Sequence, residues 1–302
     1  MTKNSELTSV LKELKQITGV SLNLSELEET DTTFAAEQLR KLCTAYKEKY
    51  NKTHFLQSIL RGELSTHDLN DQAGKFHINP TIPRILFLLE VTHPADDTTL
   101  SVLKNIFPSQ TGAFIFSISD LQLAVLYPFS EKDSDESDLT HLALSIIDTL
   151  NMEALTSVKI AYAPCIQHLS ELQDAYNKAT LALKIGKLFN SEQNIFSYNQ
   201  LSTGRLIYHL PVSVCQDFLN EVFLNQVPDS LDAELLSTIN RFFQNNLNIA
   251  ETARQLHMHR NTLIYRIEQV EKRTGLDLRN FEDAMTFKIA LMVMNYIHTK
   301  EI

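Results

Sequence analysis

The feature that most constrains the fold of this chain is a pair of amphipathic helical patterns near its C-terminus, separated by a very short turn. Asn248 is predicted to cap the first helix, and Glu251, three residues later, completes a capping box. The turn is His257-Met258-His259, in which His257 tolerates a left-handed backbone better than most residues. The second helix is expected over residues 260–273, with Gly275 as its stop. Two helices joined by such a turn predict a helix-turn-helix unit.

Further helices are expected around this pair. An amphipathic helix over residues 233–245 precedes it, and the two central helices each have a buried stripe. These apolar positions are Leu235, Leu236, Ile239, Phe242 and Phe243, then Ile249, Ala253 and Leu256, then Leu263, Ile267 and Val270. Residues 287–297 are apolar nearly all round, so this helix is expected to be buried, either in the core of the module or against a second subunit.

The polar side of the 260–273 helix carries side chains suited to DNA. Asn261, Thr262, Tyr265 and Gln269 lie opposite its buried stripe, and Arg260 lies at its N-terminal tip. Arginine donates two hydrogen bonds to guanine, and asparagine pairs bidentately with adenine. Thr262, Tyr265 and Arg266 suit phosphate contacts that set the register on DNA. From the spacing alone, an ordinary surface helix with a mixed polar face remains an alternative.

The charge of the chain is unevenly distributed. The formal net charge is −10, which is unusual for a nucleic-acid-binding protein. Residues 247–281, however, contain six Lys or Arg against four acids and therefore carry +2, so the remainder carries −12. The sequence thus predicts a locally basic module on an acidic body, which would repel DNA outside the intended contact.

A different pattern occupies the middle of the chain. The order of elements is β-α-β-β-α-β-α-β, which is typical of a ferredoxin-like mixed sheet backed by helices. Strands are expected at 85–91, 113–118, 121–127, 158–164 and 195–198, with a hairpin at Ser119-Asp120. Helices are expected over 100–107, after the acidic loop 131–138 as far as Leu150, and over 170–188, opened by Ser170. The fold class is therefore α+β.

The flanking segments are predicted to be helical. Residues 4–17 and 34–60 have apolar residues at helical spacing, which leaves open packing within the chain or pairing with a second chain, and 66–76 predicts a short helix. We expect a helical N-terminal segment at 1–79, a sheet domain at 80–200, a helical connector at 201–231 and a helix-turn-helix domain at 232–302.

The run IAETARQLHMHRNTLIYRIEQVEKRTGLDLRNFEDAMTFKIALMV resembles the C-terminal helix-turn-helix of the PucR/CdaR family of bacterial regulators. It is also similar to the Fis-type helix-turn-helix, in which the residues that open the second helix reach bases. This resemblance implies that His259 and Arg260 contact bases, with Thr262, Tyr265 and Arg266 following. FLQSILRGEL with the 66–79 helix, and the 83–200 sheet, are similar to the middle of the same family.

In that family the middle domain resembles the diguanylate cyclase (GGDEF) fold. The resemblance places Ser119 and Asp120 at the glycine positions of the cyclase signature, and Leu121 and Gln122 at its acidic positions. Leucine cannot bind Mg²⁺, which requires oxygen ligands, and Glu90 is the one acid near the expected metal position. We therefore expect a degenerate domain without catalytic activity, retained for dimerisation or ligand sensing.

Other chemistry finds little support in the sequence. Cys43, Cys165 and Cys215 are odd in number and widely spaced, which favours free thiols in a cytoplasmic protein. His257 and His259 lack neighbouring ligands for a metal, and no Ser-His-Asp or Cys-His arrangement is evident. The N-terminus has no apolar signal region and no run is long enough to span a membrane. No enzyme activity, cofactor or metal is expected.

These inferences favour a cytoplasmic regulator that binds double-stranded DNA as a homodimer and controls genes for uptake or catabolism of a metabolite. A small-molecule effector is left open, and its identity is not encoded in any motif. The alternative is a signalling or interaction protein that binds a small ligand or a partner through the cyclase-like domain and uses the helical module for assembly only.

Overall fold

The computed structural model describes Leu11 and residues 32–129, 136–223 and 232–300. The chain divides into two compact units. The first contains residues 1–183 and 194–199, and the second contains residues 184–193 and 200–302. The predicted helix at 4–17 lies outside the described residues apart from Leu11, as does most of the predicted acidic loop. The predicted domain boundaries at 79/80, 200/201 and 231/232 stay predictions.

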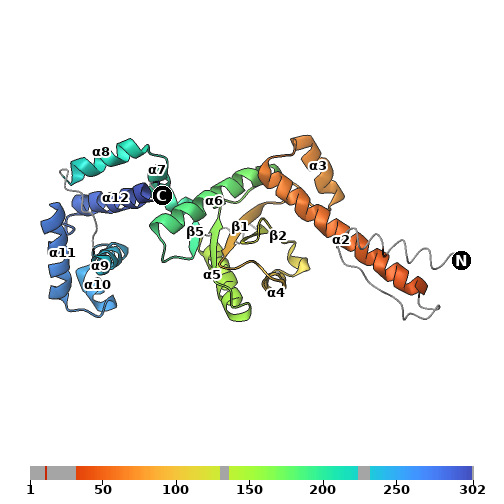
Figure 1. The fold of residues 1–302 in the computed structure, drawn as a ribbon, viewed down its shortest axis with the longest axis horizontal. Helices are drawn as coiled ribbons and strands as arrows, with labels where there is room; N and C mark the ends of the chain where they lie inside the picture. Colours follow the sequence, from red (N-terminus) through yellow and green to blue (C-terminus); the bar gives the residue numbers. More distant parts are fainter. Residues whose placement is uncertain (1–10, 12–31, 130–135, 224–231, 301–302) are drawn as a thin grey trace. The chain divides into compact units, whose positions relative to one another are not determined.

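The first unit is built on a five-stranded mixed sheet with the order β2-β3-β1-β4-β5 (Figure 1). The strands are β1 (Arg84–Val91), β2 (Phe114–Ser117), β3 (Gln122–Pro128), β4 (Val158–Tyr162) and β5 (Ile195–Ser197). β1 pairs antiparallel with both β3 and β4, β2 pairs antiparallel with β3, and β5 adds in parallel beside β4. The first four strands have the ferredoxin-like order, so the predicted α+β fold is confirmed.

β1 is buried along nearly its whole length because helices cover both faces of the sheet. Ile85, Phe87 and Leu89 pack into one core with α4 (Asp97–Ile106) and α5 (Glu136–Glu153). Figure 1 shows α6 (Leu172–Phe189) on the other side of the sheet. A continuous apolar run, without alternation, is the sequence pattern that such a two-sided position requires.

Several predicted helix starts differ from the structure. α5 begins at Glu136, inside the predicted acidic loop 131–138. α4 begins three residues earlier than expected, because the side chain of Asp96 caps it by accepting a hydrogen bond from the N–H of Thr99 (2.8 Å). Ser170 does not open α6: it lies in a short 3₁₀ turn, and α6 begins at Leu172.

The helices N-terminal to the sheet are α2 (Thr32–Arg61) and α3 (Thr66–Lys75). The last two turns of α2 bury their apolar residues within the chain: Phe55, Leu56, Ile59 and Leu60 are 2–4% exposed. Gln57 donates from Nε2 to the carbonyl of Ser117 on β2 (2.7 Å). Of the two interpretations left open by the sequence, packing within one chain is therefore the one observed for this part of α2.

The second unit is helical throughout its described residues. It contains α7 (Ser202–Tyr208), α8 (Val212–Val222), α9 (Ala233–Gln244), α10 (Ile249–Gln255), α11 (Arg260–Thr274) and α12 (Phe281–His298). The apolar face of α12 packs within the unit, with Phe287, Ala290 and Val293 at most 1% exposed. The core of the module therefore accounts for the burial of these residues without a second subunit. No helix in the described parts of the chain is long and apolar enough to cross a membrane.

Candidate nucleic-acid interface

The C-terminal unit contains the predicted pair of helices, α10 and α11, joined by a tight turn. The backbone of His257 is left-handed with φ of 50°, as its place in the turn predicted. The N–H of Met258 donates to the carbonyl of Ala253 (3.0 Å), which closes the end of α10. Ala253 is 5% exposed, and Leu263, Ile267 and Val270 of α11 lie in the same core. The turn and the shared core therefore fix the angle between the two helices.

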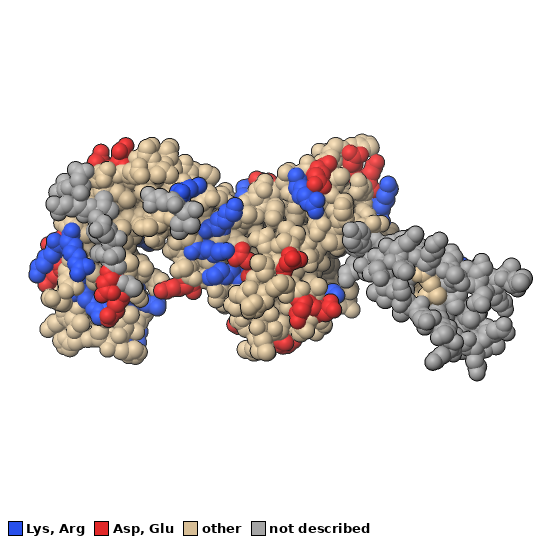
Figure 2. Space-filling model, in the orientation of Figure 1, with Lys and Arg blue, Asp and Glu red and all other residues tan. Residues whose placement is uncertain are grey.

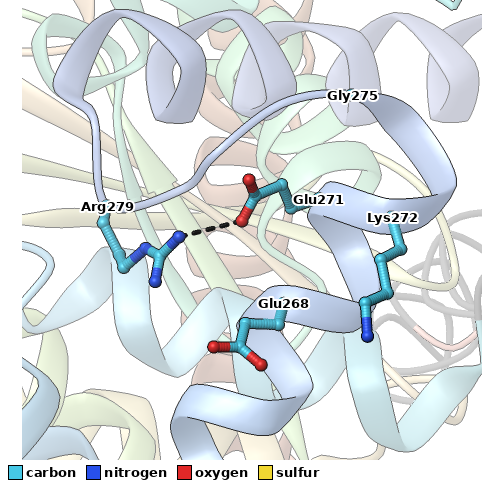
Figure 3. A pocket seen from close by; sticks show the side chains of 5 residues that line it. All are labelled: Glu268, Glu271, Lys272, Gly275 and Arg279. Carbon is cyan, nitrogen blue, oxygen red and sulfur yellow. Dashed lines mark hydrogen bonds and ion pairs between the residues drawn. The ribbon is translucent and has the colours of Figure 1, made fainter.

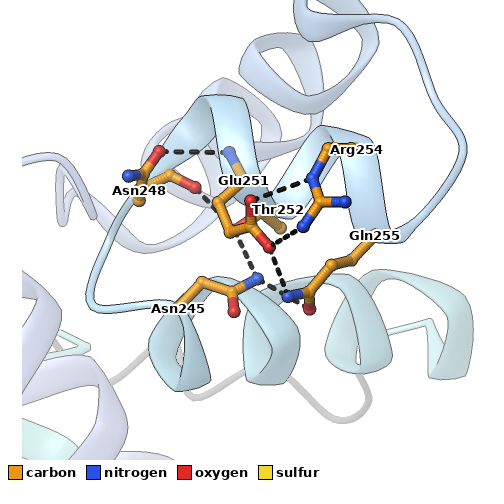
Figure 4. A network of polar contacts seen from close by, with 6 residues as sticks. All are labelled: Asn245, Asn248, Glu251, Thr252, Arg254 and Gln255. Carbon is orange, nitrogen blue, oxygen red and sulfur yellow. Dashed lines mark hydrogen bonds and ion pairs between the residues drawn. The ribbon is translucent and has the colours of Figure 1, made fainter.

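The start of α10 is capped differently from the prediction (Figure 4). Asn248 accepts from the N–H of Glu251 (3.1 Å), so the predicted N-cap is confirmed. The reciprocal half of the capping box is wrong, because the N–H of Asn248 donates to the carbonyl of Asn245 instead (3.0 Å). The carboxylate of Glu251 turns toward Arg254, which donates to it twice (2.6 and 3.0 Å), and toward Gln255 (2.7 Å).

A second layer of polar contacts connects α10 to the end of α9 (Figure 4). Asn245 donates from Nδ2 to Thr252 Oγ1 (3.2 Å) and to Gln255 Oε1 (3.1 Å). Thr252 is fully buried and donates to the carbonyl of Asn248 (2.7 Å). These contacts were not predicted from the sequence, in which their only signal is the polar Thr252 beside the small Ala253 on the inner side of α10.

α11 begins with a histidine cap. The Nδ1 atom of His259 accepts a hydrogen bond from the backbone N–H of Asn261 (3.2 Å), so this ring nitrogen is an acceptor and Nε2 carries the ring proton. Gly275 ends the helix in the left-handed conformation with φ of 77°, as predicted. The predicted helix over 260–273 is thus extended by one residue, to Thr274.

The predicted recognition side chains lie together on the exposed side of α11, near its N-terminus. Arg260, Asn261, Thr262 and Tyr265 are all exposed, and Tyr265 is 56% exposed. Their side chains make no hydrogen bond or ion pair with any of the described residues. Together they place a guanidinium group, an amide, a hydroxyl and a phenol at one end of the helix. Such a surface can donate to and accept from base edges and phosphates.

Arg266 has a different environment from the rest of this set. It forms an ion pair with Glu234 of α9, and its Nη1 donates to Thr238 Oγ1 (2.6 Å). Its side chain is 22% exposed, whereas that of Glu234 is 71% exposed. The structure therefore places Arg266 in the joint between α9 and α11, rather than with its guanidinium extended beside Arg260.

Intramolecular pairing also changes the charge pattern of the module. Arg254 pairs with Glu251, and Arg279 pairs with both Glu271 and Asp277. These hydrogen bonds lower the pKa of Glu251 and of Asp277. Of the six Lys and Arg residues within 247–281, all of them described, Arg260, Lys272 and Arg273 have no ion pair. Of these three, only Arg260 belongs to the predicted recognition side chains.

A hollow at the opposite end of α11 has little capacity to bind an ion. It is lined by Glu268, Glu271, Lys272, Gly275 and Arg279 (Figure 3). The guanidinium of Arg279 donates to Glu271 (2.9 Å), so charges of both signs are matched inside it. In the described parts of the chain there is no cluster of three His, Cys, Asp or Glu side chains able to hold a metal.

The hairpin that would carry the cyclase signature lies at one end of β2 and β3. The carbonyls of Asp120 and Leu121 accept from the N–H groups of Ala95 (3.0 Å) and Val91 (2.9 Å), which holds the turn against the end of β1. Leu121 is 44% exposed and has no oxygen to offer a cation. Glu90 lies opposite Gln122 in the strand register. Figure 2 shows the charged side chains of one face of the molecule.

Two parts of the chain match known protein domains. The model of the PucR C-terminal helix-turn-helix domain matches residues 235–293, and that of the GGDEF-like domain matches residues 61–185. The purine catabolism regulatory protein of Bacillus subtilis (strain 168) is 31% identical over 142 residues, which cover 47% of this chain and 27% of that protein.

Two further relatives align over most of this chain. The proline-responsive transcriptional activator PutR of Bacillus subtilis (strain 168) is 25% identical over 263 residues, covering 82% of this chain and 63% of that protein. The carbohydrate diacid regulator of Escherichia coli (strain K12) is 21% identical over 265 residues, covering 85% of this chain and 69% of that protein. The chain thus spans less than two thirds of the first two relatives.

Proposed function

We propose that the chain is a sequence-specific, DNA-binding transcriptional regulator, because residues 61–185 match the GGDEF-like domain and residues 235–293 match the PucR C-terminal helix-turn-helix domain. The observation that carries the proposal is the cluster of Arg260, Asn261, Thr262 and Tyr265. These side chains are exposed on one helix end and have no partner among the described residues. The N-terminal end of this helix exposes several hydrogen-bond donors, and the helix is fixed in place by its buried side chains. Such a helix end fits the major groove.

We assign separate roles to these residues. Arg260 and Asn261 read base edges, because both side chains can form paired hydrogen bonds with one base. Thr262 and Tyr265 contact phosphates and set the register. His259 caps α11 through Nδ1, which leaves its Nε2–H free to donate to a phosphate or a base. Arg266 keeps α11 attached to α9, and its contribution to DNA binding is indirect.

We propose that the regulator binds DNA as a homodimer. Helix-turn-helix proteins read paired half-sites about 34–36 Å apart, and a single recognition helix buries little surface. Sedimentation should give two chains of 34.4 kDa per operator, after the mass of the DNA is subtracted. One chain per operator, with a species of the single-chain mass at micromolar concentration without DNA, would contradict the homodimer and leave the DNA-binding assignment to be judged separately.

In the GGDEF-like domain we propose a sensing or dimerising role without catalysis. Ser119 and Asp120 replace the glycines, and Leu121 and Gln122 replace the acids, that the resemblance would require for a cyclase. The names of the relatives refer to purine catabolism, proline and carbohydrate diacids. By analogy, this chain controls genes for the uptake or catabolism of a small metabolite.

The proposal is tested by selecting genomic fragments with the full chain and titrating the best fragment at several salt concentrations. A scrambled fragment of the same length and composition is the control. We expect binding at least ~10³-fold tighter to the selected fragment, falling as salt increases. Equal, weak binding to both fragments would contradict sequence-specific regulation. It would favour instead a signalling or interaction protein whose helical module serves assembly.

A further inference from the structure

Two cations of the GGDEF-like unit lie against one aromatic ring. Arg84 opens β1, Lys52 lies on α2 and Phe114 opens β2. The Nζ atom of Lys52 is 4.3 Å from the centre of the Phe114 ring, and the guanidinium carbon of Arg84 is 5.7 Å from the same point. The two charges are therefore at most about 10 Å apart. Arg84 is only 2% exposed.

No acid neutralises this pair within the described residues. Arginine remains protonated in proteins, so burial of Arg84 keeps a positive charge inside the domain. Burial and the charge of Arg84 both lower the pKa of Lys52. The face of a phenyl ring attracts cations but carries no net charge. Among the residues that the structure describes, the cluster thus has an unbalanced positive charge, which is unusual for a buried site.

The hydrogen bonds of Arg84 occupy only one side of its guanidinium group. Nη1 donates to the carbonyls of Asn79 (2.9 Å) and Ile82 (3.0 Å), which holds the turn before β1. Nε is buried without an acceptor, and Nη2 makes no hydrogen bond with the described residues. The Nε–H and one Nη2–H of arginine point along the same edge. This is the edge that binds the two oxygens of a carboxylate or a phosphate.

We propose that Lys52 and Arg84, beside Phe114, form a binding site for the oxyanion group of a small metabolite. The Nε and Nη2 edge of Arg84 binds two oxygens, and Lys52 supplies the second charge. Lys52 is half-buried and Arg84 is 2% exposed, so we expect entry of the anion to need movement of the Lys52 side chain. Binding of the anion at this site does not require DNA. Only an effect of the bound anion on DNA affinity would rest on the proposed function.

The test is thermal unfolding of the full chain in sodium phosphate, in sodium succinate and in sodium chloride. The three solutions have equal ionic strength, so that charges on the protein are screened equally in all of them. We expect a saturable rise of roughly 3–6 °C at ten times the Kd of one or both oxyanions, beyond any rise in chloride. A response to phosphate alone assigns the site to phosphorylated metabolites, and a response to succinate alone assigns it to dicarboxylates.

Variants connect the response to the cluster. Lys52→Gln should weaken binding of the same probe at least about tenfold, because one charged hydrogen bond is lost. Lys104→Gln, which removes an exposed lysine from α4, should bind like the wild type. Arg84→Lys keeps the positive charge but removes the two parallel N–H donors of the guanidinium group. If this variant folds, it should also bind the probe at least about tenfold more weakly than the wild type.

Two results would overturn the proposal. One is the absence of any saturable rise beyond chloride with either probe at concentrations on the order of 50 mM, where even weak anion sites fill. The other is an unchanged affinity in Lys52→Gln. Neither depends on whether the chain binds DNA, so failure of this site and failure of the proposed function are distinguishable.

Discussion

Arg266 on α11 and Glu234 on α9 form an ion pair, with Thr238 as a second partner of the same guanidinium. The pair joins residues 32 positions apart. It connects the helix that carries the predicted recognition side chains to the first helix of the module. Arg266 therefore holds α11 against α9, and the phosphate contact expected from the sequence stays a prediction.

The first prediction concerns this joint. Arg266→Ala should destabilise the C-terminal unit by about 1–2 kcal/mol, since a partly buried charged hydrogen bond is lost. A double-mutant cycle with Glu234→Ala should give a coupling of about 0.5–1 kcal/mol, because Glu234 is largely exposed. Urea unfolding measures both values.

The same variant separates the two roles of Arg266. In Arg266→Ala, the slope of log affinity against log salt concentration should stay at its wild-type value, because an Arg266 side chain that is paired with Glu234 makes no phosphate contact. A slope reduced by about one would show that Arg266 neutralises a phosphate. Glu234→Ala is the matched control, since it breaks the joint without removing a cation.

The second prediction follows from Glu251. Hydrogen bonds from Arg254, and then from Gln255, lower the pKa of this carboxylate in the folded chain. As the pH falls, the unfolded chain takes up the proton first, so the contribution is fully present above the ordinary value of 4.5 and is lost as the pH falls through the lowered one.

Glu251→Gln should therefore flatten the dependence of unfolding free energy on pH below 4.5. The measurement is urea unfolding at a series of pH values for both chains. In 1 M salt the difference between the two curves should shrink, because the group is exposed to solvent. Parallel curves at low salt would show that the pair with Arg254 contributes nothing to folding.

The third prediction compares two glycines that both have open space around the position of a Cβ atom. Gly275 has φ of 77°, so Gly275→Ala should destabilise the C-terminal unit by about 1 kcal/mol through backbone strain alone. Gly74 is in α3 without a left-handed backbone, so Gly74→Ala should stabilise the other unit by about 0.5–1 kcal/mol. Effects of the same sign in the two variants would contradict this account.

The fourth prediction concerns the GGDEF-like domain. Incubation of the chain with GTP and Mg²⁺ should give no cyclic dinucleotide, because Leu121 and Gln122 provide no carboxylate at the hairpin. Chromatography of the nucleotides after overnight incubation is sufficient. Formation of a product by the wild type, and not by a Glu90→Gln variant, would identify an acid-dependent activity and refute the non-catalytic role.

Much of the fold could be predicted because it depends on local patterns. The run Ile85 to Val91 is buried on both sides and reads as an uninterrupted apolar segment. Asn248, His257 and Gly275 are recognisable because a cap and two left-handed positions select particular residue types. These requirements are met within a few residues, so no knowledge of the tertiary structure is needed.

The partners of charged side chains could not be predicted in the same way. Glu251 had two local choices, the N–H of Asn248 or the donors Arg254 and Gln255, and the sequence pattern does not decide between them. The partner of Arg266 is on another helix. Arg84 directly precedes the predicted strand 85–91 and was given no role from the sequence; its burial follows from the turn whose carbonyls it binds.

The central claim is that the N-terminal end of α11 reads DNA sequence, and Arg260→Ala tests it most directly. Its affinity is measured for the selected fragment and for the scrambled one, beside Arg61→Ala, which removes an exposed arginine from the other unit. We predict a loss of about 1–3 kcal/mol on the selected fragment, little change on the scrambled one, and unfolding like the wild type. Unchanged affinity for the selected fragment, or an equal loss on both fragments and in both variants, would contradict the claim.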